Sequence, residues 1–136
     1  MKTTATEKYN KPYTEVVKIL DEGFSDMKKG QKMLISSPKS IAAYIQKIPR
    51  GEQRTIKQLR AGLAKDADAD NTCPLTAGIF LRIAVEASLE EQLVGHKNKL
   101  FLPFWRLLSE DSPLVEKLAI PHQLIRDMRK SEGIQD

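Results

Sequence analysis

Cysteine and long apolar runs are what this sequence has least of. Its one cysteine, Cys73, has no partner for a disulfide within the chain and suits a reducing compartment. No run approaches the ~18 apolar residues of a membrane span, and residues 1–8 are too polar for the core of a secretory signal. The sequence therefore predicts a cytoplasmic protein without a membrane partner.

Aromatic residues are also scarce, at 6% of the 136 residues, whereas hydrophobic residues make up 40% and charged residues 29%. That balance is typical of a globular chain with one ordinary core, and the chain is too short for two. The net charge of +4 and the sequence pI of about 9.2 favour anionic partners only slightly.

Patterns that bind metals are missing as well. His96 and His122 stand far apart, and neither has a second ligand at metal-binding spacing. Asp66, Asp68 and Asp70 alternate as in a calcium-binding loop, but the glycine and the closing glutamate of such a loop are absent. The sequence therefore predicts no metal site and no cofactor.

Residues 1–36 are predicted to form a loose polar arm, a helix and a short strand ahead of the main domain, residues 37–136. Apolar side chains recur at near-helical spacing from Val16 to Met27, which predicts a helix there. The short apolar run Met33–Ile35 predicts the strand.

Four further helices are predicted from capping residues and apolar periods. Ser37 followed by Pro38 starts one helix, and Thr55 followed by Gln58 is a capping box that starts the next. Apolar stripes place the four helices at about residues 38–48, 56–63, 74–93 and 123–130.

Two short strands are predicted around Pro103, at residues 100–102 and 105–108. A basic turn at 95–99 precedes them, and residues 109–113 follow as a hairpin tip. Three helices, a β-ribbon and a last helix follow one another in the order of a winged helix-turn-helix. The predicted fold is therefore α+β and mainly helical, a winged helix-turn-helix domain with a small β-ribbon and an extra N-terminal helix.

Three sequence blocks stand out by their order, namely Ile48–Ile56, Pro103–Leu108 and Gln123–Gly133. They resemble the DNA-binding domain of methylated-DNA–protein-cysteine methyltransferases, in which the blocks read roughly I-P-x-G-x-x-x-T-Y, P-C-H-R-V-I and L-L-x-x-E-G. The segment Thr72–Thr76, taken with residues 103–106, is similar to small bacterial relatives of that family. The resemblance covers about residues 37–134 and implies a DNA-binding protein related to DNA repair.

The resemblance shows both matches and departures. It places Ile56 at the motif's tyrosine and Leu75 at the arginine that fills the space left by a flipped base. Phe104 stands at the alkyl-accepting cysteine, and Trp105 stands at the histidine next to it. Other positions keep the family's residue, among them Thr55, Gly78, Pro103, Arg106, Glu132 and Gly133.

These replacements exclude alkyl transfer at the family's reactive position. Phenylalanine carries no nucleophile, and the indole N–H of tryptophan cannot accept a proton. We therefore predict a protein that is not an enzyme, like the alkyltransferase-like proteins, although a nucleophilic role for Cys73 at a helix start stays open. The former lesion pocket is predicted to be filled, with Leu75, Phe104 and Trp105 closing over one another beside Glu132.

The predicted function is non-catalytic binding of duplex DNA, including modified or distorted duplex. Basic side chains around the third predicted helix would supply contacts to phosphates. Seven residues are predicted to contact DNA: Arg50, Arg54, Thr55, Lys57, Arg60, Gly78 and Arg106. The alternative is a winged-helix module that binds another protein and has no role on DNA.

Overall fold

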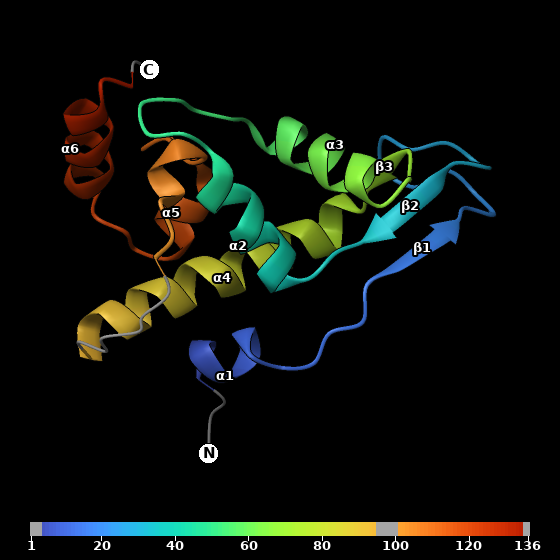
Figure 1. The fold of residues 1–136 in the computed structure, drawn as a ribbon, viewed down its shortest axis with the longest axis horizontal. Helices are drawn as coiled ribbons and strands as arrows, with labels where there is room; N and C mark the ends of the chain where they lie inside the picture. Colours follow the sequence, from blue (N-terminus) through green and yellow to red (C-terminus); the bar gives the residue numbers. More distant parts are fainter. Residues whose placement is uncertain (1–3, 95–100, 135–136) are drawn as a thin grey trace.

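Helix α2 (Pro38–Lys47) packs against both α3 (Ile56–Asp66) and α4 (Pro74–Val94), and these three helices form the centre of the fold (Figure 1). The other helices are α1 (Ala5–Tyr9), α5 (Pro113–Lys117) and α6 (His122–Glu132), with a 3₁₀ turn at Phe104–Arg106. The computed structural model describes residues 4–94 and 101–134. Over that part the chain is α+β and mainly helical, as predicted.

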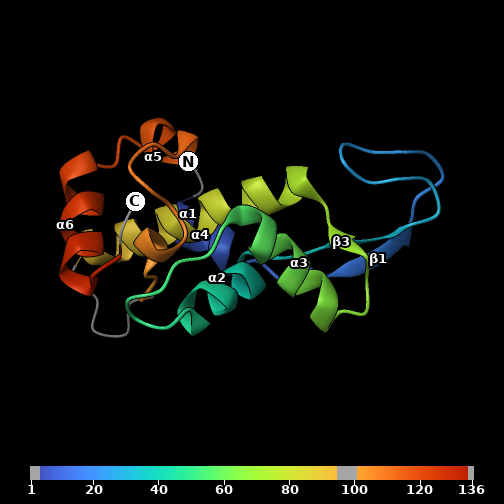
Figure 2. The same cartoon turned by 90° about the horizontal axis from the view of Figure 1, so that it is seen from above.

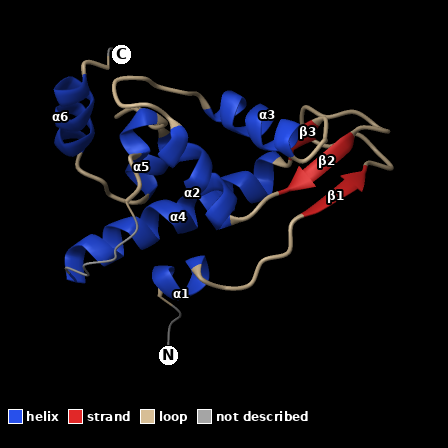
Figure 3. Ribbon diagram, in the orientation of Figure 1, coloured by secondary structure: helices blue, strands red, loops and turns tan. Residues whose placement is uncertain are grey.

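Three short strands make one sheet at the end of the molecule away from α6 (Figures 1 and 3). Strand β1 (Val16–Ile19) pairs antiparallel with β2 (Lys32–Ile35). Strand β2 pairs in parallel with β3 (Asn71–Thr72), with Leu34 opposite Thr72. Residues from the predicted N-terminal region and from the predicted main domain therefore share one sheet.

The helix predicted between Val16 and Met27 is wrong, because this segment forms β1 and the loop that leads to β2. Within that loop an isolated antiparallel bridge joins the backbones of Phe24 and Met27. The β-branched side chains of β1 suit a strand, and the pairing with β2 supplies the hydrogen bonds that hold it extended. The strand predicted at residues 33–35 is confirmed as part of β2.

The N-terminal arm is also more ordered than predicted. Helix α1 begins after Thr4, and the Glu90 carboxylate of α4 accepts hydrogen bonds from the backbone N–H groups of Ala5 and Thr6, both at 3.1 Å. These are donors that the first turn of a helix leaves without an internal partner. Glu90 therefore fastens α1 to α4.

The helix starts predicted at Ser37 and Thr55 are confirmed. The side chain of Ser37 accepts a hydrogen bond from the backbone N–H of Ser40, and the Ser40 side chain accepts one from the backbone N–H of Ser37. Thr55 and Gln58 exchange the same two hydrogen bonds at the start of α3. At the other end of the chain α6 stops at Gly133, whose φ of 77° is the left-handed conformation that glycine adopts without strain.

The strands predicted on either side of Pro103 are not found among residues 101–108. Residues 104–106 form the 3₁₀ turn instead, and the side chains from Leu102 to Leu108 are buried. A short segment that is buried on all sides is apolar at every position, whether it forms a strand or a turn. The apolar pattern of this segment therefore could not distinguish the two structures. The predicted basic turn at 95–99 lies outside the described residues, as does Leu100 of the predicted strand at 100–102.

The main core lies between α2, α3, α4 and the 3₁₀ turn. Its fully buried side chains include Ile41 and Ile45 of α2, Leu59 of α3 and Val85 of α4. No helix in the described part of the chain is long and apolar enough to cross a membrane.

Candidate functional site

The three sequence blocks meet at the carboxylate of Glu132. Its oxygens accept hydrogen bonds from Trp105 Nε1 at 2.8 Å, from Arg106 Nε at 2.9 Å and Nη2 at 3.0 Å, and from the backbone N–H of Gly51 at 3.2 Å. The Arg106 hydrogen bonds are the largest reason that the pKa of Glu132 falls to about 2, with Trp105 and Gly51 adding to them. The carboxylate is thus charged and serves as a structural hub.

Arg106 is buried, and each of its three guanidinium nitrogens donates a hydrogen bond within the protein. Its Nη1 donates to the carbonyl oxygen of Ile48 at 2.9 Å, and its other two nitrogens bind Glu132. Its own carbonyl oxygen accepts from the N–H of Arg54 at 2.9 Å. The side chain predicted to contact DNA therefore links the turn before α3 to α6.

Phe104 and Trp105 are buried, as expected. The residues are 1% and 6% exposed, and their rings meet edge to face with centroids 5.5 Å apart. Leu75 does not close over them as predicted, because it lies on the outer face of the first turn of α4 and is 63% exposed.

An open apolar groove of about 450 Å³ runs between the start of α3, the outer face of α4 and α5. Its wall on α4 is formed by Leu75, Gly78, Ile79 and Arg82, whose spacing puts them on one helical face. Gly78 faces free space, since a Cβ placed there would meet nothing within 4 Å. The groove was not predicted, although Leu75, Gly78, Ile79 and Arg82 form a recognisable helical stripe in the sequence.

The predicted basic residues do not form one continuous exposed row. Arg50 and Lys57 are exposed, whereas Arg54 is partly covered and pairs with Glu52 at 3.0 Å. The Arg50 Nη2 also donates to the carbonyl oxygen of Ser131 at 3.2 Å, which keeps this side chain near the end of α6.

Arg60 is not on the surface, contrary to expectation. It is 6% exposed, its two terminal nitrogens donate to Asp26 at 2.8 Å each, and its Nε donates to the carbonyl oxygen of Thr72 at 2.9 Å. The hydrogen bond from Arg60 is also the main cause of a lowered pKa at Asp26. Arg60 therefore ties α3 to β3 and to the β1–β2 loop.

Thr55 lies at the start of α3, where its Oγ1 accepts from the N–H of Gln58 at 3.1 Å. The neighbouring residues Ile56 and Lys57 are exposed, at the positive end of the helix dipole. This helix end and the groove-lining face of α4 are adjacent, because Ile56 lines the groove too.

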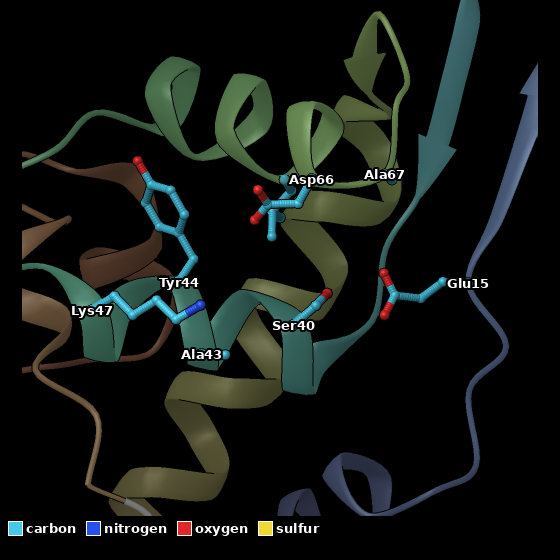
Figure 4. A pocket seen from close by; sticks show the side chains of 8 residues that line it. Glu15, Ser40, Ala43, Tyr44, Lys47, Asp66 and Ala67 are labelled. Atoms are coloured by element: carbon cyan, nitrogen blue, oxygen red, sulfur yellow. The ribbon is translucent and has the colours of Figure 1, made fainter.

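A second pocket of about 280 Å³ lies between α2, α3 and the segment that leads into β1 (Figure 4). Its charged lining residues, Glu15, Lys47 and Asp66, are of mixed sign. The Tyr44 ring reaches from α2 toward α3 (Figure 4), where a Cβ on Gly62 would come within 2.7 Å of its Cε2. The absence of a side chain at Gly62 thus permits this close packing of α2 and α3.

Cys73 is buried in a small cluster with Met27 and Met33. The residues that the structure describes contain no group of three or more side chains that could hold a metal ion. His122 is exposed at the start of α6, and His96 lies outside the described residues.

Comparison with family models, with curated proteins and with solved structures found no match to this chain.

Proposed function

We propose that the protein binds duplex DNA without transferring an alkyl group, as an alkyltransferase-like winged helix-turn-helix protein. The contact surface comprises the turn before α3, the first turn of α3 and the outer face of α4. The observation that carries the proposal is the exposed start of α3, where Lys57 stands in the first turn of the helix and Arg50 is exposed in the turn that precedes it. Backbone N–H groups and cations at such a helix end suit phosphate oxygens.

Charge along the groove supports the same proposal. Among the described residues that line it, Arg82 and Lys117 are cationic and none is acidic. Arg82 shares its charge with Glu86, 2.7 Å away on the next turn, so Lys117 and Lys57 are the more available cations. These cations would mainly affect the affinity for DNA rather than a preference for a base sequence, because the phosphates are the same at every base pair of the duplex.

Lesion recognition by the family's pocket does not form part of the proposal. Phe104 and Trp105 occupy that position as buried rings, and the guanidinium of Arg106 is engaged by Glu132 and Ile48. Binding then depends on the groove and on the backbone of the duplex.

A second candidate function is docking of another protein, which the exposed aliphatic side chains favour. Ile56, Leu75 and Ile79 are 45%, 63% and 49% exposed along one groove. Phosphate contacts make no use of such side chains, whereas an apolar groove with basic residues suits an acidic amphipathic segment.

Titration of a fluorescently labelled duplex at several salt concentrations tests the proposal. The Arg50→Ala, Lys57→Ala double variant, which removes the two exposed cations of this surface, is compared with Lys28→Ala, Lys29→Ala, which removes the same charge from the β1–β2 loop. We expect the first variant to bind every duplex more weakly and to reduce the salt slope by roughly two units. The control is expected to keep the parent's affinity to within about twofold, apart from a small effect of net charge.

Equal binding by both double variants would remove the start of α3 from the contact surface. Absence of any salt-dependent binding by the parent would overturn the DNA proposal and leave the protein-docking candidate. The Leu75→Ser, Ile79→Ser variant separates the two functions. It removes the apolar wall of the groove, which protein docking requires, and leaves Lys57 in place for contacts with DNA.

A further inference from the structure

The first two turns of α4 present an apolar face to the outside of the protein. Leu75 and Ile79 are 63% and 49% exposed, and their i, i+4 spacing puts them side by side on the helix. Ile56 at the start of α3 is 45% exposed and lines the same groove. The first turns of both helices contain no acidic residue. The first acidic residue of α4 is Glu86, which pairs with Arg82.

Gly78 lies on the same face, and the fold gives no reason for a glycine at this position. Its φ is outside the left-handed region, and a Cβ placed there would meet nothing within 4 Å. Inside a helix, alanine is favoured over glycine. The missing side chain instead leaves the backbone of α4 open to close approach from outside the protein.

A DNA duplex offers one apolar group that differs from base to base. The phosphates are charged, the sugars are the same at every nucleotide, and the base edges otherwise carry hydrogen-bonding atoms, but thymine adds a C5-methyl group in the major groove. That groove is wide enough to admit an α-helix. By the rise of a helix, Leu75 and Ile79 are about 6 Å apart along α4, close to two steps of ~3.4 Å along one DNA strand.

We propose that the first two turns of α4 lie in the major groove of the duplex, where Leu75 and Ile79 contact the methyl groups of thymine. Gly78 lets the base edges come close to the helix backbone. The contact rests on the DNA binding proposed above, and it adds a base preference to contacts that otherwise follow the phosphates. In helix-turn-helix proteins the second helix reads base edges with its N-terminal residues while the first helix meets the backbone, and α4 follows α3 in that order.

The charges around this face favour a duplex that lies over α3 and α4. Arg50 and Lys57 are exposed on the α3 side and suit the phosphates that flank the major groove. The α5 side is of mixed sign, because Asp111 and Glu116 are exposed there together with Lys117. The duplex is therefore expected to lie mainly away from α5.

Replacement of thymine by deoxyuridine tests the contact, because it removes only the C5-methyl group from the duplex. Two labelled duplexes of the same sequence, one with thymine and one with deoxyuridine, are titrated with the full chain at the same salt concentration. We expect the thymine duplex to bind about fourfold or more tightly, as for the burial of at least one methyl group. Replacement of cytosine by 5-methylcytosine in the deoxyuridine duplex should raise the affinity again, because it returns a methyl group to the major groove.

Two serine variants test which side chains contact the methyl groups. Leu75→Ser, Ile79→Ser should bind the thymine and deoxyuridine duplexes alike and keep the salt slope of the parent. The matched control is Val17→Ser, Ile19→Ser, which replaces two aliphatic residues of β1 that are 43% and 68% exposed and do not line the groove. Strand β1 lies at the end of the molecule away from α5 and α6 (Figure 2), so the control should keep the thymine preference. A preference that survives in the α4 variant overturns the proposal.

The Gly78→Gln variant tests the close approach to the helix backbone. Glutamine favours a helix over glycine, and its Cβ would meet nothing within 4 Å, so the variant should unfold at the temperature of the parent or above. We expect it to bind both duplexes at least fourfold more weakly, because the added side chain holds the base edges away from α4. Full affinity in the folded variant contradicts the close approach.

The thymine contact and the DNA binding on which it depends fail in different ways. Salt-dependent binding of the parent with equal affinity for the thymine and deoxyuridine duplexes overturns the thymine contact and leaves the DNA proposal standing. Insertion of one side chain between stacked bases would give this result. Absence of salt-dependent binding to any duplex overturns both, and leaves the groove to the protein-docking candidate.

Discussion

The indole N–H of Trp105 donates to Glu132 at 2.8 Å, and the same carboxylate binds Arg106 through two further hydrogen bonds. The carboxylate is only 4% exposed. Where the resemblance places a reactive cysteine and a histidine, this chain therefore has buried rings fixed by a buried ion pair. In this chain these residues have a structural role.

Acid should weaken the fold through Glu132. Its pKa in the folded protein is about 2, below the ordinary 4.5, so the unfolded chain takes up a proton first as the pH falls. The stabilisation is complete above about pH 4.5 and is lost as the pH falls toward 2, amounting to roughly 3 kcal/mol at most. Chemical denaturation between pH 6 and pH 2 measures this loss.

The Glu132→Gln variant should lower the free energy of unfolding at pH 6 by roughly 2–4 kcal/mol, because it leaves Arg106 buried without a counter-charge. It should also flatten the acid dependence. Glu116→Gln, on an exposed residue of α5, is the matched control and should change neither. An unchanged pH profile in Glu132→Gln would assign the acid sensitivity to other carboxylates.

The Arg60–Asp26 pair should respond unequally to substitution of its two members. Arg60→Ala leaves the buried carbonyl of Thr72 without its donor, and we expect a loss of roughly 2–4 kcal/mol. The Asp26 side chain is 50% exposed, so Asp26→Asn should cost clearly less than Arg60→Ala, because water can replace the lost charge on that side of the pair. Urea denaturation of both variants measures the difference, and equal losses would contradict the buried role of Arg60.

Removal of the apolar wall of the groove should cost little stability. Leu75 and Ile79 face solvent, so Leu75→Ser, Ile79→Ser is expected to lower the free energy of unfolding by less than about 1 kcal/mol. Leu59→Ala, which empties a fully buried position, should cost roughly 2–5 kcal/mol. A large loss in the groove variant would show that these side chains serve the fold rather than a partner.

Gly62 and Tyr44 should be energetically coupled. Alanine is favoured over glycine in a helix by about 1 kcal/mol, but its methyl group would collide with the Tyr44 ring at 2.7 Å. Gly62→Ala should therefore stabilise the Tyr44→Ala protein more than the parent. A double-mutant cycle by thermal unfolding checks this, and additive effects would mean that the ring moves aside freely.

Incubation with duplex containing methylated guanine should leave the mass of the protein unchanged. Phe104 has no nucleophile, and Cys73 is buried among apolar side chains. Intact-mass spectrometry measures the outcome, with an active alkyltransferase as the positive control. A methyl adduct on Cys73 would contradict both the expected lack of activity and the alignment of Phe104 with the acceptor.

The capped helices could be predicted from sequence because their signals are local. Ser37 and Thr55 each form the capping box that their neighbours in the sequence imply. Strand β1 could not be predicted in this way, since its apolar residues fit a helix equally well and its partner begins at Lys32. Pairing with residues more than ten positions later in the sequence decided that this segment is a strand. The spacing of apolar residues within the segment carries no information about such a partner.

Predictions for single charged side chains failed where burial was decided by distant partners. Arg60 was predicted to be on the surface because Arg54, Lys57 and Arg60 have helical spacing, but Asp26 and Thr72 hold it inside. The burial of Phe104 and Trp105 was predictable, since large apolar rings gain free energy by leaving water. The exposure of Leu75 was not, because it depends on where α5 lies relative to α4.

The position of Glu132 in the sequence also affects the order in which parts of the chain can fold during synthesis. A chain synthesised from its N-terminus exposes Gly51, then Trp105 and Arg106, well before Glu132 emerges. Until then Arg106 lacks the charge that makes its burial tolerable, and the aromatic rings beside it cannot settle into the native arrangement. The turn before α3 and the 3₁₀ turn would therefore reach their final contacts late, and the growing chain would carry an unfinished apolar surface from the synthesis of Trp105 until that of Glu132.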